Sequence, residues 1–580
     1  MSLAIFLDHA SLTPTPPEDD AHLTWQPVFF TKGLGVFRDS KSDYHIVSDH
    51  PEHLLLSIYP LLDHDRDHLK RMMKSRQSID SMFTYADFNL VYPYCLVVVD
   101  KLHRVVTFKN DDFGIARFYL YDGRSRVILS NCLTPIIRGS PYMMTVNYKA
   151  VRMFGAIGWF PGCTTPIEQI SQLPPGTKVN LSFGHGFPSI VSFTSNPYSC
   201  FFDLILSHKS CELMEAAVDF MNDLIRRLAM ESKRPIKAGL SGGKDSRFIA
   251  ALILSGKYPV EFITTNYFSE ETDRVRKLLA LRAGDRTFLK IREPQGSPSA
   301  EEAPKLIGAL VSLTDGMFEV SRVGKPVSAK WGGDFRLSGL GGELTHGFYY
   351  PRDIAKADLR AVSKRIQRCV VDNEELVKRG TRGDVAKSVK DVEKQWLERC
   401  EKYGSSMDDL KFADFFFLSE RLRRKSNLGL TLGLIAPMVS LYFVAYSFHL
   451  AGEEARRAAI QRNFVRDFDP KWAEQGYVSL EEGVHADRLT KREHSLHLFE
   501  LCEDTLLVRS IWGRGWRQHV LKLRKSASFR ANRLIKTVIA VNSIARHFES
   551  LCSKGQRRPA SFWRSGMDWF AGRDMQTGGR

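Results

Sequence analysis

The stretch IKAGLSGGKDSRFIAALIL, residues 236–254, decides the fold class of this chain of 580 residues. Residues 236–240 predict an extended strand, and residues 246–254 predict a helix. The glycines Gly242 and Gly243 between them let the backbone approach a ligand closely, and the helix that follows directs its free N–H groups and positive dipole end at the same place. The stretch therefore predicts an anion site, most simply one for a di- or triphosphate.

This loop differs from a Walker A loop in one informative way. A Walker A lysine is followed by Ser or Thr, whereas Lys244 is followed by Asp245. A carboxylate against phosphate is repulsive unless a metal ion lies between them, and Mg²⁺ takes oxygen ligands from carboxylates and phosphates together. We therefore expect Mg²⁺ beside Asp245.

The sequence around the loop alternates between strands and helices. Residues 212–230 and 271–282 predict helices, and residues 260–266 and 287–291 predict strands. Such alternation favours a parallel sheet with helices on its faces. Residues 356–425 are mostly helical by pattern, and the first 200 residues are mainly β, with short runs of β-branched and aromatic residues at 90–99, 104–108, 118–121, 127–129 and 178–183.

The glycine-rich loop and three further segments resemble known families. SGGKDS, residues 241–246, resembles the SGGxDS pyrophosphate-binding motif of the N-type ATP pyrophosphatases. LSGLGGELTHGFY, residues 337–349, resembles the SGxGxDExxxGY segment of the asparagine synthetase family, with Glu343 at the position of its second Mg²⁺-binding Asp. Residues 110–119 and 162–176 resemble the RDPLGxxPLY turn and the closing segment of class II glutamine amidotransferase domains. The resemblance covers roughly residues 85–450.

This resemblance implies a fold of mixed α/β and α+β class with three parts. Residues 1–204 would form a degenerate amidotransferase-like, Ntn-type β-rich sandwich, and residues 205–480 a parallel-sheet α/β ATP pyrophosphatase domain. Residues 481–580 would form a basic, partly helical C-terminal extension outside the resemblance.

The resemblance also implies ATP and Mg²⁺ as cofactors and assigns a role to each site residue. Asp245 and Glu343 would hold Mg²⁺, and Lys471 is a candidate for the late lysine that contacts pyrophosphate. Arg247 would reach a phosphate or the substrate carboxylate, or would be an exposed arginine at the helix start. The expected nucleotide-binding residues, with Leu240 and Thr264 beside the adenosine, are Leu240, Ser241, Gly242, Gly243, Asp245, Ser246, Thr264, Gly339 and Gly341.

Two departures from the family pattern refine the expected reaction. A working glutaminase has Cys after Met1, but this chain has Ser2 and lacks the glutamine-holding segments, so we expect no glutaminase activity. Leu344 replaces a Glu that handles ammonia in asparagine synthetases. These departures favour an asparagine synthase-like ligase that adenylates a carboxylate and transfers it to an amine, as in β-lactam synthetases and lasso-peptide cyclases. The alternatives are a catalytically degenerate scaffold, a tRNA-modifying ATP pyrophosphatase and a glutamine-dependent asparagine synthase.

Charge and cysteine usage bear on partners and compartment. The net charge is +16, but residues 505–580 hold 16 Lys and Arg against 3 Asp and Glu, so this last part of the extension carries +13 of it. We expect it to meet an acidic partner or an anionic membrane surface, and nucleic acid is a less favoured partner. Nine scattered cysteines without a CxxC pair, and no secretory signal, favour a cytoplasmic protein. The uncharged run 426–452, interrupted by Pro437, predicts a buried helix, loop and helix rather than a membrane span.

Overall fold

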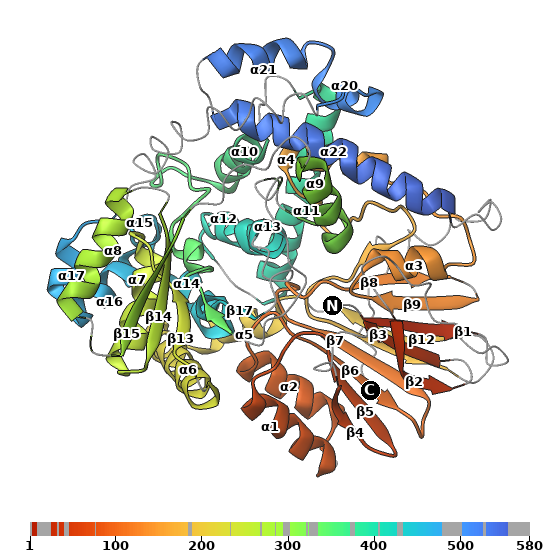
Figure 1. The fold of residues 1–580 in the computed structure, drawn as a ribbon, viewed down its shortest axis with the longest axis horizontal. Helices are drawn as coiled ribbons and strands as arrows, with labels where there is room; N and C mark the ends of the chain where they lie inside the picture. Colours follow the sequence, from red (N-terminus) through yellow and green to blue (C-terminus); the bar gives the residue numbers. More distant parts are fainter. Residues whose placement is uncertain are drawn as a thin grey trace.

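The computed structural model describes residues 3–8, 25–31, 34–39, 46–75, 77–123, 125–183, 188–195, 197–232, 234–266, 269–282, 284, 286–293, 302–318, 320, 323, 335–371, 377–403, 407–425, 433–477, 502–525 and 529–554. Within them, the N-terminal half contains two six-stranded antiparallel sheets, ordered β10-β8-β9-β1-β3-β2 and β12-β11-β7-β6-β5-β4 (Figure 1). The strands are β1 (Leu3–Asp8), β2 (Trp25–Thr31), β3 (Leu34–Asp39), β4 (Ile46–Asp49), β5 (His53–Ser57), β6 (Cys95–Asp100), β7 (Val105–Asn110), β8 (Tyr119–Asp122), β9 (Arg126–Ser130), β10 (Ser171–Gln172), β11 (Thr177–Ser182) and β12 (Ser189–Ser195).

Inner strands of both sheets, such as β1 and β6, are buried on both faces, whereas the outer strands β4 and β12 are partly exposed. Alternate residues of β1, such as Ile5, share one apolar core with alternate residues of β5 and β6, such as Leu56, so the two sheets face each other. The residues between them, such as Phe6 and Leu55, pack into a second core with helices α1 (Asp63–Lys74), α2 (Ile79–Asn89), α3 (Leu133–Gly139) and α4 (Tyr148–Ile157). The N-terminal half is therefore a sandwich of two sheets between helical layers.

The predicted strands of this half are confirmed, with one correction at a boundary. The run 90–99 contains a strand only from Cys95, because Pro93 has no N–H for the ladder and residues 90–94 form a connection instead. Helices α1 to α4 also lie in a region predicted as mainly β, since runs of β-branched residues stand out in a sequence more than short amphipathic helices do.

The alternating region forms a parallel sheet of five strands in the described residues. Its order is β15-β14-β13-β16-β17, and every pair is parallel. The predicted helices and strands at 212–291 are confirmed. The elements are α5 (Ser199–Ser207), α6 (Ser210–Glu231), β13 (Ile236–Gly239), α7 (Lys244–Ser255), β14 (Val260–Thr265), α8 (Ser269–Arg282), β15 (Thr287–Arg292), α9 (Glu302–Thr314), β16 (Arg336–Leu337) and β17 (Leu434–Ile435).

The segment after β16 is mostly helical, as predicted. It contains the 3₁₀ turn η2 (Gly342–Thr345), α10 (Leu359–Val370), α11 (Arg379–Lys402), α12 (Lys411–Phe416), the π-helical turn η3 (Phe417–Leu422) and α13 (Arg423–Lys425). Beyond β17 follow η5 (Pro437–Val439), α14 (Leu441–His449), α15 (Gly452–Arg456), α16 (Ala459–Phe468) and α17 (Pro470–Glu474).

The uncharged run is buried where the structure describes it. Residues 426–432 lie outside the described residues, and the remainder contributes strand β17 and the buried helix α14, whose Phe443 and Val444 are fully enclosed. The predicted first helix of this run falls mainly on residues outside the described part, and the described residues 434–435 that follow form strand β17. None of the helices that the structure describes is long and apolar enough to cross a membrane.

The basic extension packs against the rest of the molecule. Its helices are α20 (Leu506–Trp512), α21 (Trp516–Lys525) and α22 (Phe529–Lys554), as expected for a partly helical extension. Apolar residues of α21 and α22 are buried, among them Trp516, Val520, Leu534, Val538 and Val541. Residues 555–580 lie outside the described part. Because α22 lies against α4 and α9, the extension is not a separate appendage (Figure 1).

Candidate functional site

The strand order of the parallel sheet marks where a ligand can bind. From β13 the chain proceeds to β14 and β15 on one side, and then returns to add β16 and β17 on the other side. The connections leaving β13 and β16 therefore diverge, and in open α/β sheets such a crevice at the carboxyl ends of the strands is the usual ligand site. The loop after β13 holds SGGKDS, and the loop after β16 holds SGLGGE.

The first loop is held in shape by its own serines. Ser246 Oγ lies 2.8 Å from Ser241 Oγ and accepts a hydrogen bond from Ser241 N–H at 3.0 Å. Ser241 Oγ in turn accepts the N–H of Gly243 at 3.2 Å, directly before α7 begins. The loop therefore keeps a fixed shape at the N-terminus of a twelve-residue helix, where the free N–H groups favour an anion.

The second loop lies directly against the first, and its glycines make this possible. A Cβ on Gly339 would lie 2.8 Å from the backbone of Asp245, and a Cβ on Gly342 would lie 2.4 Å from Asp245 Oδ1. Gly341 has φ +96°, a left-handed conformation that side chains disfavour. Segments about a hundred residues apart in the sequence thus meet at Asp245, with no room for a larger residue between them.

The carboxylates of Asp245 and Glu343 are both close to this contact. Asp245 Oδ1 lies 3.0 Å from His346 Nε2 and accepts a hydrogen bond from Gln461 Nε2 at 3.1 Å. Glu343 is half-buried and accepts the N–H of Gly341 at 2.9 Å. Burial, followed by the negative charge of Asp245, raises the pKa of Glu343. The structure therefore brings together the two predicted metal ligands as interacting carboxylates.

The donor set fits Mg²⁺ only in combination with a ligand. Among the described residues, no three His, Cys, Asp or Glu side chains cluster closely enough to form a metal site by themselves. Mg²⁺, however, characteristically uses one or two carboxylates and completes its shell with water and phosphate oxygens. Asp245 and Glu343 are two such carboxylates, and they lie near the N-terminus of α7, where a phosphate could supply the remaining oxygen ligands.

Two cations lie next to the loop, and among the described residues neither forms an ion pair with a carboxylate. Lys244 is half-buried at the first position of α7, and Arg462 on α16 is close enough for its charge to act on it. Burial, and then the charge of Arg462, lower the pKa of Lys244, although Asp245 opposes them. Arg462 itself stacks on the Tyr477 ring at 4.8 Å. A positive charge at a helix N-terminus is unfavourable by itself, so this arrangement favours an anionic ligand.

Arg247 does not have either of the roles expected from the sequence. Its side chain is fully buried and donates to the carbonyl oxygens of Trp472, Gly242 and Gly476, while its guanidinium stacks on Tyr477 at 4.5 Å. Burial lowers its pKa to about 10. Arg247 therefore ties the loop to the end of α17, and it is neither exposed nor directed at a ligand.

The remaining predicted residues lie at different depths. Leu240 is a core residue whose N–H donates to Ile263 at 3.0 Å, and Thr264 is buried near the end of β14, so both border the crevice mainly through their backbone. Lys471 is exposed on α17, which packs against α16 and α8. The structure does not include its side chain in the hydrogen-bond network around Asp245. Ser2 lies outside the described residues.

Sequence reasoning missed Gln461, which links three elements at the site. Its amide donates to Asp245 Oδ1 at 3.1 Å, to Thr345 Oγ1 at 2.6 Å and to the carbonyl of Gly342 at 3.4 Å. The side chain is fully buried, yet its Oε1 accepts no hydrogen bond in the described structure. It lies 216 residues from Asp245 in a helix without a motif, so no local pattern could have identified it.

A second missed residue is Glu271 in the first turn of α8. Its Oε1 accepts the N–H of Gly242 at 3.1 Å, so a carboxylate occupies a donor of the anion-binding loop. The carbonyl of the same glycine accepts from Arg247 at 3.2 Å. A ligand phosphate would have to share or displace this carboxylate to reach the N–H of Gly242.

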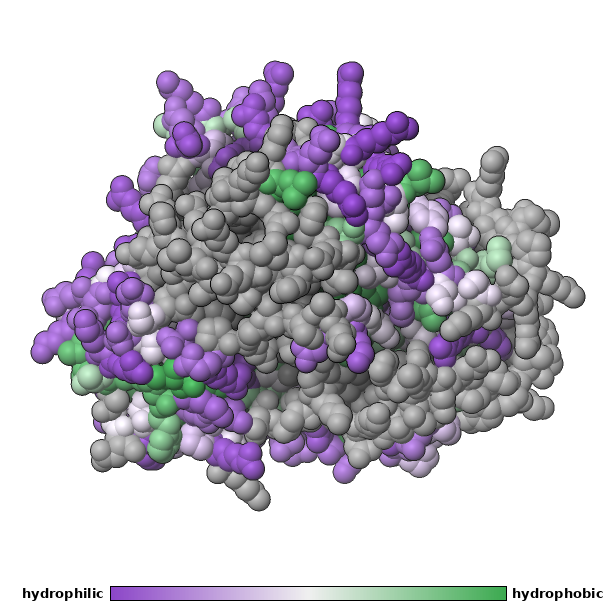
Figure 2. All heavy atoms as spheres, turned by 45° about the horizontal axis from the view of Figure 1, so that its top comes forward, coloured by the Kyte–Doolittle hydropathy of each residue, from purple (hydrophilic) through white to green (hydrophobic). Residues whose placement is uncertain are grey.

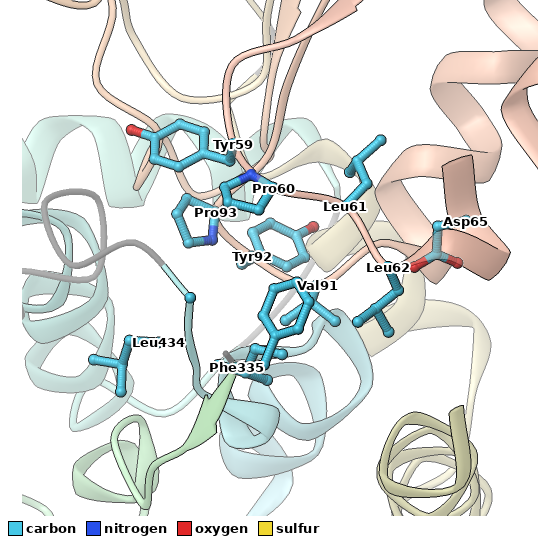
Figure 3. A pocket seen from close by; sticks show the side chains of 12 residues that line it. Tyr59, Pro60, Leu61, Leu62, Asp65, Val91, Tyr92, Pro93, Phe335 and Leu434 are labelled. Carbon is cyan, nitrogen blue, oxygen red and sulfur yellow. The ribbon is translucent and has the colours of Figure 1, made fainter. Parts of the chain in front are cut away.

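A separate small pocket lies at the amino ends of the parallel strands, whereas the two glycine-rich loops lie at their carboxyl ends (Figure 3). It has a volume of about 30 Å³ and borders the amino ends of β16 and β17 at Phe335 and Leu434. Its other walls come from the N-terminal half, including Tyr59, Tyr92 and Asp65. Asp65 pairs with the buried Arg227 at 2.5 Å. This pocket is thus not part of the crevice that holds the two glycine-rich loops.

Comparison with known proteins adds no relative. No protein-family model matches the chain, and a search of the curated proteins returned no match.

Proposed function

We propose that this protein is an ATP-dependent amide-forming ligase, which activates a carboxylate as an acyl-adenylate and passes it to an amine. The observation that carries the proposal is the contact between the two glycine-rich loops at the switch point of the parallel sheet. It brings Asp245 and Glu343, which the resemblance to the asparagine synthetase family pairs as metal ligands, to one place beside an anion-binding helix end.

Each part of the site has a role in this reaction. Ser241, Gly243 and the N-terminus of α7 would bind the pyrophosphate that leaves when the carboxylate attacks the α-phosphate. Lys244 and Arg462 would compensate its charge. Mg²⁺, which Asp245 and Glu343 would hold, would neutralise the negative charge that develops on the phosphate oxygens. Gln461 and His346 would fix the orientation of Asp245.

We further propose that the N-terminal sandwich is a degenerate Ntn-type, amidotransferase-like domain. The arrangement of two antiparallel sheets between helical layers supports this proposal. So does the turn that resembles RDPLGxxPLY, where Asp111 accepts the N–H groups of Ile115 at 2.9 Å and Ala116 at 2.7 Å. Purified protein should release no glutamate from glutamine; release that is lost in Ser2→Ala would contradict the proposal.

The ligase proposal is tested by the products of ATP. A panel of carboxylic acids should cause release of pyrophosphate and AMP that requires Mg²⁺, and hydroxylamine added as the amine should trap the activated acid as a hydroxamate. Asp245→Ala should abolish both signals. The matched control Asp273→Ala, an exposed carboxylate on α8 paired with Arg276 at 2.8 Å, should leave them unchanged. ADP and orthophosphate as products would refute adenylation.

A catalytically degenerate scaffold is the second candidate, and Glu271 is the observation that favours it. The Glu271 carboxylate accepts the N–H of Gly242, which a bound phosphate would otherwise use as a hydrogen-bond donor. If this contact is permanent, the site would bind Mg·ATP weakly and release no pyrophosphate with any acid. The variant Glu271→Gln distinguishes the two candidates. An active ligase already releases pyrophosphate with Glu271 in place. If Glu271 blocks the site, removal of its negative charge should increase the affinity for ATP by about tenfold or more.

A further inference from the structure

The charged residues of helix α10 are all positive. Its apolar residues Val362, Ile366 and Val370 are buried, and the helix packs against α11 and α12. By helical spacing, the opposite side carries four basic residues, all of them exposed: Arg360, Lys364, Arg365 and Arg368. No Asp or Glu occurs among residues 359–370. α10 is therefore an amphipathic helix that directs only positive charge to the solvent.

The start of α11 adds to this positive surface. Ser363 of α10 donates a hydrogen bond to Glu393 of α11 at 2.6 Å, so the two helices lie side by side (Figure 1). Arg379 and Arg382 are exposed at the N-terminal end of α11, whose first turn contains no acidic residue. A positive side chain is unfavourable at the positive end of a helix dipole. We define the basic face as Arg360, Lys364, Arg365, Arg368, Arg379 and Arg382.

The described structure does not neutralise the basic face. Within the described part of the chain, none of its six residues forms an ion pair. Nearby acids are engaged elsewhere, since Glu393 accepts from Ser363 and Asp384 pairs with Lys149 at 3.4 Å. Residues 359–382 hold seven Lys and Arg against three Asp and Glu, and these three acids lie outside the described residues. The face thus keeps a surplus of positive charge.

The basic extension differs in this respect, because several of its arginines are paired with its own acids. Arg509 pairs with Asp504 at 2.8 Å, and Arg546 pairs with Glu503. An ion pair within the protein reduces the charge that is left for a partner. A partner attracted by charge would therefore meet less competition from carboxylates of the protein itself at α10 and the start of α11.

The spacing of the charges on α10 suits a linear partner. Arg360, Lys364 and Arg368 recur every four residues, which places them about 6 Å apart along about 12 Å of the helix. Like charges at this spacing destabilise the helix that carries them. A row of carboxylates along a partner would relieve this repulsion, and arginine can bind a carboxylate through two parallel hydrogen bonds.

Other anionic partners fit this surface less well. Binding to a membrane surface uses apolar side chains that enter the lipid, but no large apolar side chain of α10 is exposed. Single-stranded nucleic acid is bound by stacking on aromatic rings, and Trp396, the aromatic residue of α11, is buried. The described surface at this end of the molecule is mostly hydrophilic, with small separate hydrophobic patches (Figure 2). Charge and hydrogen bonds are thus what the basic face offers a partner.

We propose that the basic face binds an acidic segment of a polypeptide, whose carboxylates follow the row of positive charges on α10. The inference is independent of the proposed ligase function, because no residue of the basic face belongs to the candidate site. Binding should be tightest at low ionic strength, since salt at 0.1 M screens exposed charges over about 10 Å.

The test uses the full-length protein and two fluorescent peptides of equal length, a Glu-Ala repeat and a Gln-Ala repeat. Fluorescence anisotropy should show that the Glu-Ala peptide binds about tenfold more tightly, and that added NaCl weakens its binding. Arg365→Gln combined with Arg368→Gln should reduce the affinity by about fivefold. The control, Arg276→Gln combined with Lys277→Gln, removes the same charge from an exposed part of α8 and should retain the parent affinity.

The other outcomes contradict the proposal. If the Gln-Ala peptide binds as tightly as the Glu-Ala peptide, or if the control loses as much affinity as the Arg365 and Arg368 variant, the basic face is not the binding surface. Tighter binding of oligouridylate, or of vesicles that contain phosphatidylserine, would assign the face to nucleic acid or to lipid instead. Equal melting temperatures of parent and variant verify folding. If the double variant does not fold, Lys364→Gln decides, and an unchanged affinity in that variant refutes the proposal.

Discussion

At the scale of single residues, the candidate site depends on backbone approach as much as on charge. Gly342 has no side chain, and this absence lets the second loop lie against Asp245. Gln461 and His346 then hold the carboxylate from the other side. The chemistry of Asp245 therefore depends on residues that a search for catalytic side chains alone would pass over.

Gly342→Ala should disrupt the site more than the fold. Its Cβ would lie 2.4 Å from Asp245 Oδ1, so the loop or the carboxylate must move. We expect loss of pyrophosphate release by about a hundredfold or more, because displacements of about 1 Å in a site have this effect. Gly308→Ala is the control, since a Cβ there meets nothing within 4 Å and an alanine in the helix α9 should stabilise by about 0.5–1 kcal/mol. Equal activity of both variants would contradict the close contact.

Glu343 should reduce the stability of the metal-free protein at neutral pH. Burial and the charge of Asp245 raise its pKa, so the folded protein holds this proton more tightly than the unfolded chain does. Stability must then fall as pH rises from the ordinary glutamate pKa through the raised one. Glu343→Gln should therefore be more stable than the parent at pH 8, and the difference should disappear towards pH 4.

Thermal unfolding at both pH values, with and without Mg·ATP, checks this prediction. Mg·ATP should stabilise the parent protein and have little effect on Glu343→Gln, because the metal requires the ionised carboxylate. The exposed Glu398→Gln on α11 is the control and should follow the parent. A variant that is less stable at pH 8 would show that Glu343 is structural.

At the scale of elements, the basic extension is part of the core. Ile535, Val538 and Val541 of α22 are buried, and a Cβ on Gly155 of α4 would lie 3.2 Å from Val541 and 2.6 Å from Ile511. The helices α4 and α22 therefore approach closely through a glycine. Charged residues of α22 such as Arg546 and Glu549 are exposed, while its apolar residues pack into the core.

Val538→Asp should therefore destabilise the whole protein. A buried carboxylate without a partner costs several kcal/mol, and removal of the valine adds the loss of its apolar burial. We expect a fall of about 3 kcal/mol or more in the free energy of unfolding, measured with urea. Ser550→Asp, at an exposed position of the same helix, should change it by less than about 0.5 kcal/mol. Equal stability of both variants would mean that α22 is dispensable.

At the scale of the whole molecule, three buried arginines join the two halves. Arg423 donates to the carbonyl oxygens of Gly114 and Leu173 at 2.8 Å each, and Arg117 donates to that of Arg424 at 3.3 Å. Arg424 also donates to the side chain of Gln172. These bonds link α13 to the closing segment of the N-terminal sandwich, so the half with the parallel sheet and the sandwich are expected to unfold together.

Arg423→Leu tests this coupling. It leaves two buried carbonyl groups without donors, which should cost about 2–4 kcal/mol. We expect a lower urea midpoint of unfolding and separate unfolding transitions for the two halves. Tryptophan fluorescence and far-UV circular dichroism measure these transitions. Arg457→Leu is the control, because that side chain is exposed and contacts Glu453 only at 3.9 Å. A single unchanged transition in Arg423→Leu would show that other contacts hold the halves together.

The sequence by itself determined the alternation of strands and helices from residue 212 to 291, the two glycine-rich loops and the helices of the extension. These features depend on local periodicity and on glycine, which a short window of sequence records. The sequence also paired Asp245 with Glu343 through a resemblance, and the structure places these carboxylates beside each other.

The remaining features depend on contacts between distant parts of the chain. The local sequence predicts that Arg247 faces a ligand or is exposed. The end of α17, more than two hundred residues away in the chain, buries its side chain instead. Gln461 and Glu271 reach the loop from helices without motifs. These contacts join residues far apart in the chain, and their partners are set by the packing of whole elements, which no local pattern encodes.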